Sequence, residues 1–161
     1  MSLIWPEIED NSIMMDNKML SRNLSLQEAV TSQTAIRKKI DNTPSQEVIY
    51  NLRRVAVLIF QKVRDHFEKP IRVSSGYRSK ALNKAVGGSK SSQHITGEAL
   101  DIQGTNGVTN AEIFYYIKDN LDFDQLIWEY GNEDNPAWVH VSCRNEGNRK
   151  QVFPIGVKKE F

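Results

Sequence analysis

The segment from Thr43 to about Phe67 constrains the fold most, because it carries the longest helical pattern in the chain. It opens with Thr43-Pro44-Ser45-Gln46, which offers an N-cap, a proline at the first helical position and a glutamine at the third. Apolar residues then recur at helical spacing, at Val48, Leu52, Val55, Ile59 and Val63. The pattern predicts one long amphipathic helix, which Pro70 prevents from continuing.

Shorter patterns surround this segment. Further helices are expected to begin at the capping boxes 25–28 and 109–112 and at Ser79. Alternation of apolar and polar residues predicts strands at 71–74, 98–103, 125–130 and 137–142, with one more possible strand at 151–153. The loop 131–136 would join two strands into a hairpin. Together they predict an α+β fold, with a small, mostly antiparallel sheet and helices packed on one face.

A length of 161 residues favours one domain with its own hydrophobic core. Residues 1–23 show no clear periodicity, and we expect them to form an N-terminal extension. Residues 24–143 are expected to form the domain, and the basic segment 144–161 a tail that packs on it. The single Cys143 excludes an internal disulfide framework.

Charge and hydropathy exclude two classes of partner. The net charge of +1 gives no global field that would attract nucleic acid. The longest apolar run, residues 55–60, is far too short for membrane insertion. The N-terminus lacks a basic region followed by an apolar one, so we expect no signal peptide and synthesis in the cytoplasm. We also expect a monomer.

Three residues that can bind a metal lie in two short motifs. His94 and Asp101 belong to the segment 92–101, and His140 ends Trp138-Val139-His140. Two imidazoles and one carboxylate suit a zinc site with an open fourth position, which is typical of catalytic zinc. Zinc-bound water loses a proton near neutral pH, so the set indicates a hydrolase. On spacing alone, the alternative is that the histidines are hydrogen-bonded structural residues.

The residues around these ligands carry a resemblance. Ser75-Gly76-Tyr77-Arg78-Ser79, the segment 92–101 and Trp138-x-His140 closely resemble the M15 family of zinc peptidases, over about residues 24 to 143. The likeness is best to its D-alanyl-D-alanine carboxypeptidase-like branch, found in bacteria and in phage lytic enzymes. It implies a fold like that of Hedgehog and D-Ala-D-Ala peptidases, with one zinc ion on His94, Asp101 and His140. It also implies hydrolysis of a peptide bond in peptidoglycan stem peptides by zinc-activated water, by a carboxypeptidase or an endolysin-like endopeptidase.

The resemblance extends to residues that could contact substrate. Arg78 matches the family's arginine thought to contact the substrate carbonyl or carboxylate, which a guanidinium suits. Its alternative is a surface arginine in a turn. Ser92 and Gln93 border the ligand loop and either contact substrate or serve only as turn residues. Trp138 is expected beside the metal, where it packs on the site or contacts substrate.

The catalytic base is where the chain departs from the family. Many members place an acid three residues before the last histidine, where this chain has Ala137. Glu129 is the candidate base, because pairing of Tyr130 with Ala137 would set Glu129 opposite Trp138 and diagonal to His140. A one-residue shift would turn it away, which leaves the loop acids Glu133 and Asp134 as alternatives.

Other interpretations of the sequence remain open. Without a base, the domain would be a zinc-containing module that binds peptide or cell wall with weak or no catalysis. A hydrolase of another peptide, or a structural zinc domain, are further alternatives. The resemblance implies action at the bacterial cell wall, for example as a phage or prophage lysis protein. The basic tail, with Arg144, Arg149, Lys150, Lys158 and Lys159, could touch anionic wall polymers.

Overall fold

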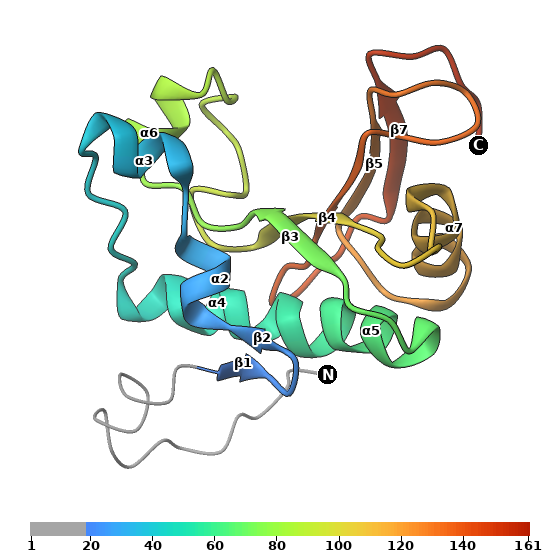
Figure 1. The fold of residues 1–161 in the computed structure, drawn as a ribbon, viewed down its shortest axis with the longest axis horizontal. Helices are drawn as coiled ribbons and strands as arrows, with labels where there is room; N and C mark the ends of the chain where they lie inside the picture. Colours follow the sequence, from blue (N-terminus) through green and yellow to red (C-terminus); the bar gives the residue numbers. More distant parts are fainter. Residues whose placement is uncertain (1–18) are drawn as a thin grey trace.

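The computed structural model describes residues 19–161 (Figure 1). Most of the expected N-terminal extension, residues 1–18, lies outside the described residues. Within the rest of that segment, β1 (Met19–Ser21) pairs antiparallel with β2 (Leu24–Ser25). Leu20 and Leu24 are buried in the core, so β1 and β2 belong to the folded domain.

Two short helices follow, α2 (Leu26–Val30) and α3 (Gln33–Lys38). The predicted capping box begins α2: Ser25 accepts from the backbone of Glu28, and the Glu28 carboxylate accepts from the backbone of Ser25. The same arrangement of Thr109 and Glu112 begins α7 (Asn110–Asn120). Ser79 caps α6 (Lys80–Ala85) as predicted.

The long helix predicted for residues 43–67 is confirmed, with two differences. It consists of α4 (Gln46–Val55), a π-helical turn η1 (Ala56–Phe60) and α5 (Gln61–Phe67) in unbroken succession. Its N-cap is Ser45, because Thr43 is held by Asp41 instead. The π turn carries one extra residue, which the apolar spacing does not reveal.

The main sheet has the order β3-β4-β6-β5-β7. Its strands are β3 (Arg72–Ser75), β4 (Ala99–Gln103), β5 (Gln125–Glu129), β6 (Trp138–Ser142) and β7 (Gln151–Ile155). The first three pairings are antiparallel, but β7 runs parallel to β5. The expectation of a mostly antiparallel sheet is therefore met only in part, and the sheet is mixed. Strand β6 ends beside the start of β5, and the loop 143–150 keeps the chain at that end of the sheet, where β7 begins.

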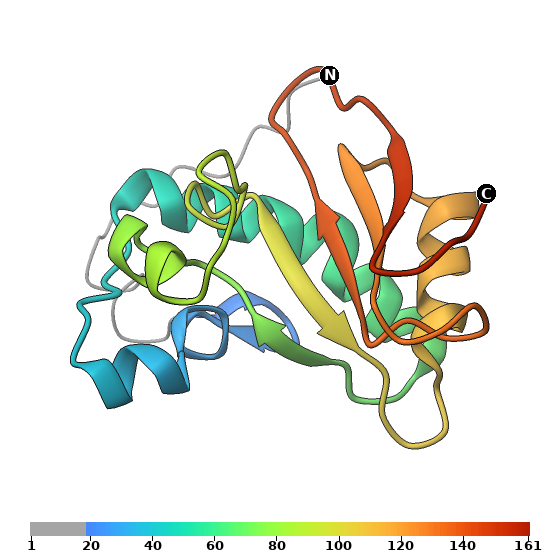
Figure 2. The same ribbon diagram turned by 90° about the horizontal axis from the view of Figure 1, so that it is seen from above.

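The sheet has one covered face and one open face. The long helix lies behind the strands in Figure 2, and α7 packs on β4, β5 and β6. The covered face presents the apolar side chains Leu100, Ile102, Leu126, Trp128, Val139 and Val141 to the core. Alternation then turns Asp101, Glu129, Trp138 and His140 to the open face. The helices α2, α3 and α6 gather next to β3 at one side (Figure 1).

Candidate metal centre

His94, Asp101 and His140 come together on the open face of the sheet. Asp101 on β4 and His140 on β6 are direct cross-strand partners. His94 reaches them from the loop that precedes β4. Asp101 Oδ1 lies 3.2 Å from His94 Nε2 and 3.0 Å from His140 Nδ1. All three side chains are buried, and their nearest ligand atoms lie within 4.8 Å of one another.

The loop that carries His94 is fixed by backbone groups. His94 Nδ1 lies 2.6 Å from the carbonyl oxygen of Gly76, and the backbone N–H of Arg78 donates to the His94 carbonyl. An Nδ1–H that donates to Gly76 leaves a lone pair on Nε2, directed at Asp101. The motif around Gly76 therefore orients the first ligand.

Gly97 shapes the same loop, and it gives a first prediction. Its φ is +78°, and a Cβ there would lie 2.8 Å from the Val48 carbonyl oxygen. We expect Gly97→Ala to lower the free energy of unfolding by about 3 kcal/mol, from left-handed strain and the clash together. Gly147→Ala, with a φ of +70° and no atom within 4 Å, is the matched control and should lose only about 1 kcal/mol. Urea unfolding of both variants tests this, and equal losses would contradict the role of the close approach.

The donor set fits a metal ion. In a tetrahedral zinc site with bonds of about 2.0–2.1 Å, ligand atoms lie about 3.3 Å apart, close to the two distances measured from Asp101 Oδ1. Atoms that face each other so closely need a positive charge between them, which either a proton on an imidazole or a metal ion can supply. Burial raises the pKa of Asp101, but the charge of His94 and hydrogen bonds with both imidazoles outweigh it and hold that pKa below its usual range. The carboxylate is thus ready to bind a cation.

Glu129 lies beside these ligands. The hairpin has the predicted register, with Glu129 directly opposite Trp138. The carboxylate Oε1 lies 3.8 Å from His140 Nδ1, and the side chain is 16% exposed. Burial, followed by the negative charge of Asp101, raises the pKa of Glu129. A mostly buried carboxyl group with a raised pKa at this position is suited to accept and return a proton.

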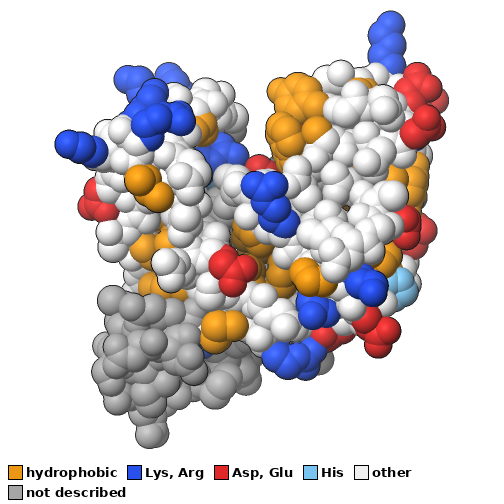
Figure 3. Space-filling model, viewed as in Figure 1, with side chains coloured by type: hydrophobic (Ala, Val, Ile, Leu, Met, Phe, Trp, Pro, Cys, Tyr) orange, Lys and Arg blue, Asp and Glu red, His pale blue; other side chains and the backbone are white. Residues whose placement is uncertain are grey.

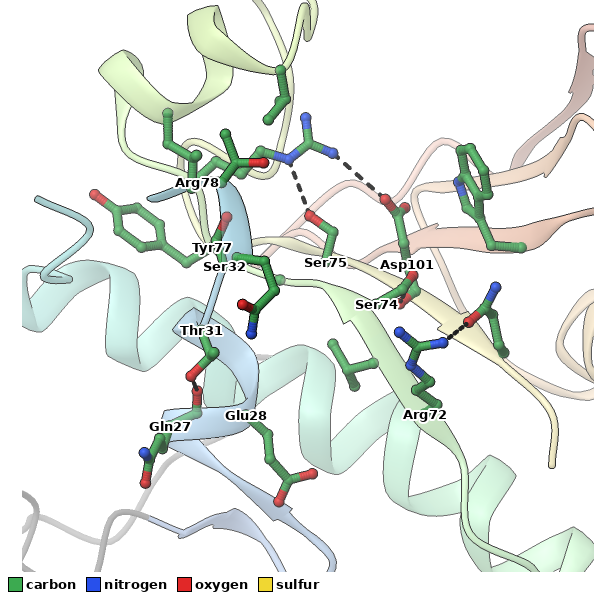
Figure 4. A pocket seen from close by; sticks show the side chains of 18 of the residues that line it. Gln27, Glu28, Thr31, Ser32, Arg72, Ser74, Ser75, Tyr77, Arg78 and Asp101 are labelled. Atoms are coloured by element: carbon green, nitrogen blue, oxygen red, sulfur yellow. Dashed lines mark hydrogen bonds and ion pairs between the residues drawn. The ribbon is translucent and has the colours of Figure 1, made fainter. Parts of the chain in front are cut away.

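Arg78 is not a solvated surface arginine, since its side chain is only 16% exposed. Its Nε donates to Ser75 Oγ and one guanidinium nitrogen to Asn83 Oδ1, each at 3.1 Å. The other nitrogen lies 3.5 Å from Asp101 Oδ2, the oxygen turned away from the imidazoles (Figure 4). This last contact is long, so the guanidinium could exchange it for a substrate group.

A cleft of about 990 Å³ extends from Asp101 along β3 to α2 and α3 (Figure 4). Arg72, Gln103 and Trp138 line it from the sheet, and Gln27 on α2 lines it together with Thr31 and Ser32, which connect α2 to α3. Of these residues, only Trp138 was predicted from the sequence, because a polar residue on a helix or strand carries no local signal that it lines a cleft. In the space-filling view the molecule is hollowed between the lobe of α3 and α6 and the lobe of β5 and β7 (Figure 3).

The other predicted substrate contacts lie around this centre. Ser92 Oγ accepts from the backbone N–H of His94, which is a turn contact. Gln93 donates to Asp124 Oδ2, and its own Oε1 is buried with no partner in the described part of the chain. The indole N–H of Trp138 is buried beside the Glu129 carboxylate, where it acts to lower the pKa of Glu129, and the Trp138 side chain lines the cleft.

The carboxylate that holds Gln93 gives a second prediction. Asp124 is fully buried and also accepts hydrogen bonds from the backbone and guanidinium of Arg149. The bonds from Arg149, with a smaller part from Gln93, outweigh burial and lower the pKa of Asp124 from 3.8 to about 2. Because the pKa of Asp124 is lower in the folded than in the unfolded chain, the ionised carboxylate stabilises the fold. This stabilisation is fully present above pH 3.8 and is lost as the pH falls toward 2.

We therefore expect Asp124→Asn to lower the free energy of unfolding by about 2 kcal/mol at pH 7. The difference from the parent protein should shrink between pH 4 and pH 2. Urea unfolding across this range measures it, with Asp119→Asn on the exposed surface as the control. A difference that stays constant with pH would show that the charge of Asp124 is not what stabilises the fold.

Comparison with known proteins gives the family. The profile of Peptidase M15 matches residues 22–142, most of the chain. No curated protein matches it significantly. Within residues 19–161, no helix is both long and apolar enough to cross a membrane. The matched segment contains all three residues of the His-Asp-His cluster, which could hold the metal that peptidases of this family use. The chain belongs to the Peptidase M15 family.

Proposed function

We propose that this chain is a zinc-dependent metallopeptidase that hydrolyses a peptide bond in the stem peptides of bacterial peptidoglycan. It would act at the cell wall as a monomer, in the manner of a D-Ala-D-Ala carboxypeptidase or of an endolysin. The observation that carries the proposal is the convergence of His94, Asp101 and His140 at the end of a polar cleft. Three buried ligands, with no fourth histidine or cysteine beside them among residues 19–161, favour a catalytic site over a structural one.

Zinc bound to these ligands would lower the pKa of a water molecule and polarise the scissile carbonyl. Glu129 is the proposed base, which takes the proton of the attacking water and passes it to the leaving amine. Its position opposite Trp138 and 3.8 Å from His140 Nδ1 supports this role, and so does its raised pKa. The loop acids Glu133 and Asp134 are exposed and make no ion pair within the described residues, which favours Glu129 over them.

Arg78 is proposed to bind the substrate carbonyl or carboxylate. The guanidinium is held on two sides by Ser75 and Asn83, so it stays aimed into the cleft when its long contact with Asp101 is exchanged. Trp138 lines the cleft, and its indole N–H lies close enough to the Glu129 carboxylate to lower the pKa of Glu129, so Trp138 is proposed to contact substrate beside the base. Ser92 and Gln93 are proposed to act through the ligand loop, since both side chains are engaged there.

One observation favours a second candidate function. Glu129 Oε1 is close enough to His140 that a small side-chain movement could bring the carboxylate to the metal, and Ala137 replaces the family acid. A fourth protein ligand would leave no open position. The domain would then be a zinc-containing module that binds peptide or wall with weak or no catalysis.

Digestion of purified peptidoglycan tests the proposal, with products identified by mass spectrometry. Parallel samples would contain a chelator, and a chelator followed by added zinc. Release of defined stem-peptide fragments that stops with the chelator and returns with zinc is the expected result, and the fragments identify the bond. A zinc-loaded protein that cleaves no type of wall would leave the binding module as the better account.

A further inference from the structure

A second cavity lies on the other side of the ligand loop and is surrounded by lysines. It has a volume of about 630 Å³, and Lys80, Lys84 and Lys90 line it. Its remaining wall comes from Asn83 on α6, from Gly87 and Gly88 after that helix and from the loop 91–96, and no acidic side chain lines it. Three positive charges around one cavity, without a negative one, indicate an anionic ligand.

These lysines belong to a wider basic surface. All three are exposed, and none forms an ion pair with a described residue. The neighbouring helix α3 contributes Arg37 and Lys38, and Lys39 follows it. Because α3 packs on α6, the six cations share one lobe, where Lys and Arg side chains gather in the space-filling view (Figure 3). We call this the α3–α6 surface.

Most cations of the C-terminal tail, by contrast, have a partner within the described residues, and Lys158 is the exception. Arg149 is paired with Asp124, and Lys150 with Asp122. The ammonium of Lys159 lies over the ring of Trp128. These cations are already compensated within the domain, so the wall contact that the basic sequence suggested for the tail is better placed on the α3–α6 surface.

We propose that the cavity binds phosphodiester groups of an anionic cell-wall polymer. Lysine ammonium groups are mobile point charges that bind phosphate without the fixed geometry of an arginine fork, which suits successive phosphates of a flexible polymer. A polymer with repeated phosphates can engage the cavity and the cations of α3 together. The choice of a wall polymer rests on the proposed function, because only action at the wall brings the two into contact.

The cavity is joined to the metal centre through short links. Asn83 lines it, donates to the carbonyl of Ser89 and accepts from the guanidinium of Arg78. Ser92, Ile95 and Thr96 line it from the loop that carries His94. A polymer held here would lie next to the cleft, and it would keep the enzyme on the wall between cleavage events.

Cosedimentation with wall sacculi tests the proposal. The zinc-loaded full chain would be mixed at 4 °C with sacculi that carry a phosphodiester polymer, and with the same sacculi after hydrofluoric acid has removed it. We expect the triple variant K80Q/K84Q/K90Q to bind the intact sacculi at least about tenfold more weakly than the parent protein. Removing the polymer should weaken the parent similarly, and added salt should weaken it further.

A second triple variant of equal charge is the control. K62Q/K69Q/K158Q changes exposed lysines outside the α3–α6 surface and should bind like the parent. Equal losses in the two variants, equal binding to stripped sacculi, or tighter binding to duplex DNA would each overturn the proposal. Hydrolysis of a soluble stem peptide is measured separately and should not change in K80Q/K84Q/K90Q. If the parent protein bound the polymer but hydrolysed no peptide, only the proposed function would be contradicted, and the binding proposal would stand.

Discussion

We expect the replacement of Asp101 by alanine to weaken metal binding severely and to abolish the proposed hydrolysis. Asp101 Oδ1 is the atom that both imidazoles face, so the variant loses one of three ligands and the negative charge between them. Loss of a residue that merely supports a ligand costs about 10–100-fold in metal affinity, and loss of a ligand should exceed this. We expect zinc affinity to fall by more than about a hundredfold, and activity to fall to background.

Competition with a chromophoric chelator measures the affinity, and elemental analysis of the purified protein measures zinc content. Asp119→Ala, an exposed acid on α7, is the control and should keep both zinc and activity. Zinc should raise the midpoint of thermal unfolding of the parent protein, and it should not raise that of Asp101→Ala. A variant that still binds one zinc ion with unchanged affinity would show that the cluster is not the metal site.

The positions of two ligands could be predicted because strands have a side-chain period of two. Once Leu100 and Ile102 are assigned to the core, Asp101 must lie on the open face. His140 follows in the same way between Val139 and Val141. The position of Glu129 needed the hairpin register as well, and this register was correct. His94 lies in a loop, which has no side-chain periodicity, so its place in the cluster was predicted from the donor set and from the family resemblance and not from the strand pattern.

Other features depend on contacts between distant segments, which no local pattern contains. β7 pairs parallel with β5 because loop 143–150 is held to the start of β5, where the backbone N–H of Arg149 donates to Asp124. The cleft exists because the backbone N–H of Tyr77 donates to the carbonyl of Ala29, which sets α2 beside β3. Single sequence segments therefore identified the residues of the His-Asp-His cluster, but not the surfaces around them.

We expect the replacement of Glu129 by glutamine to separate catalysis from metal binding. Glutamine keeps the size of the side chain but cannot accept the proton of the attacking water. We expect kcat to fall by about 10²–10⁴-fold, which is the usual contribution of a positioned base, while zinc content stays at one ion per chain. KM should change little, since Glu129 is proposed to act on the water and not on the bound peptide.

The loop acids supply the controls, because Glu133→Gln and Asp134→Asn change the same hairpin at its exposed end. Both should retain full activity if Glu129 is the base. Loss of zinc in Glu129→Gln would instead identify Glu129 as a fourth ligand. Its approach to 3.8 Å from His140 Nδ1 would then favour the binding module. Unchanged kcat in Glu129→Gln, with a large loss in one loop variant, would move the base to that loop. Zinc content and kcat, measured together in the three variants, therefore distinguish an enzyme from a domain in which four protein ligands leave no open position on the metal.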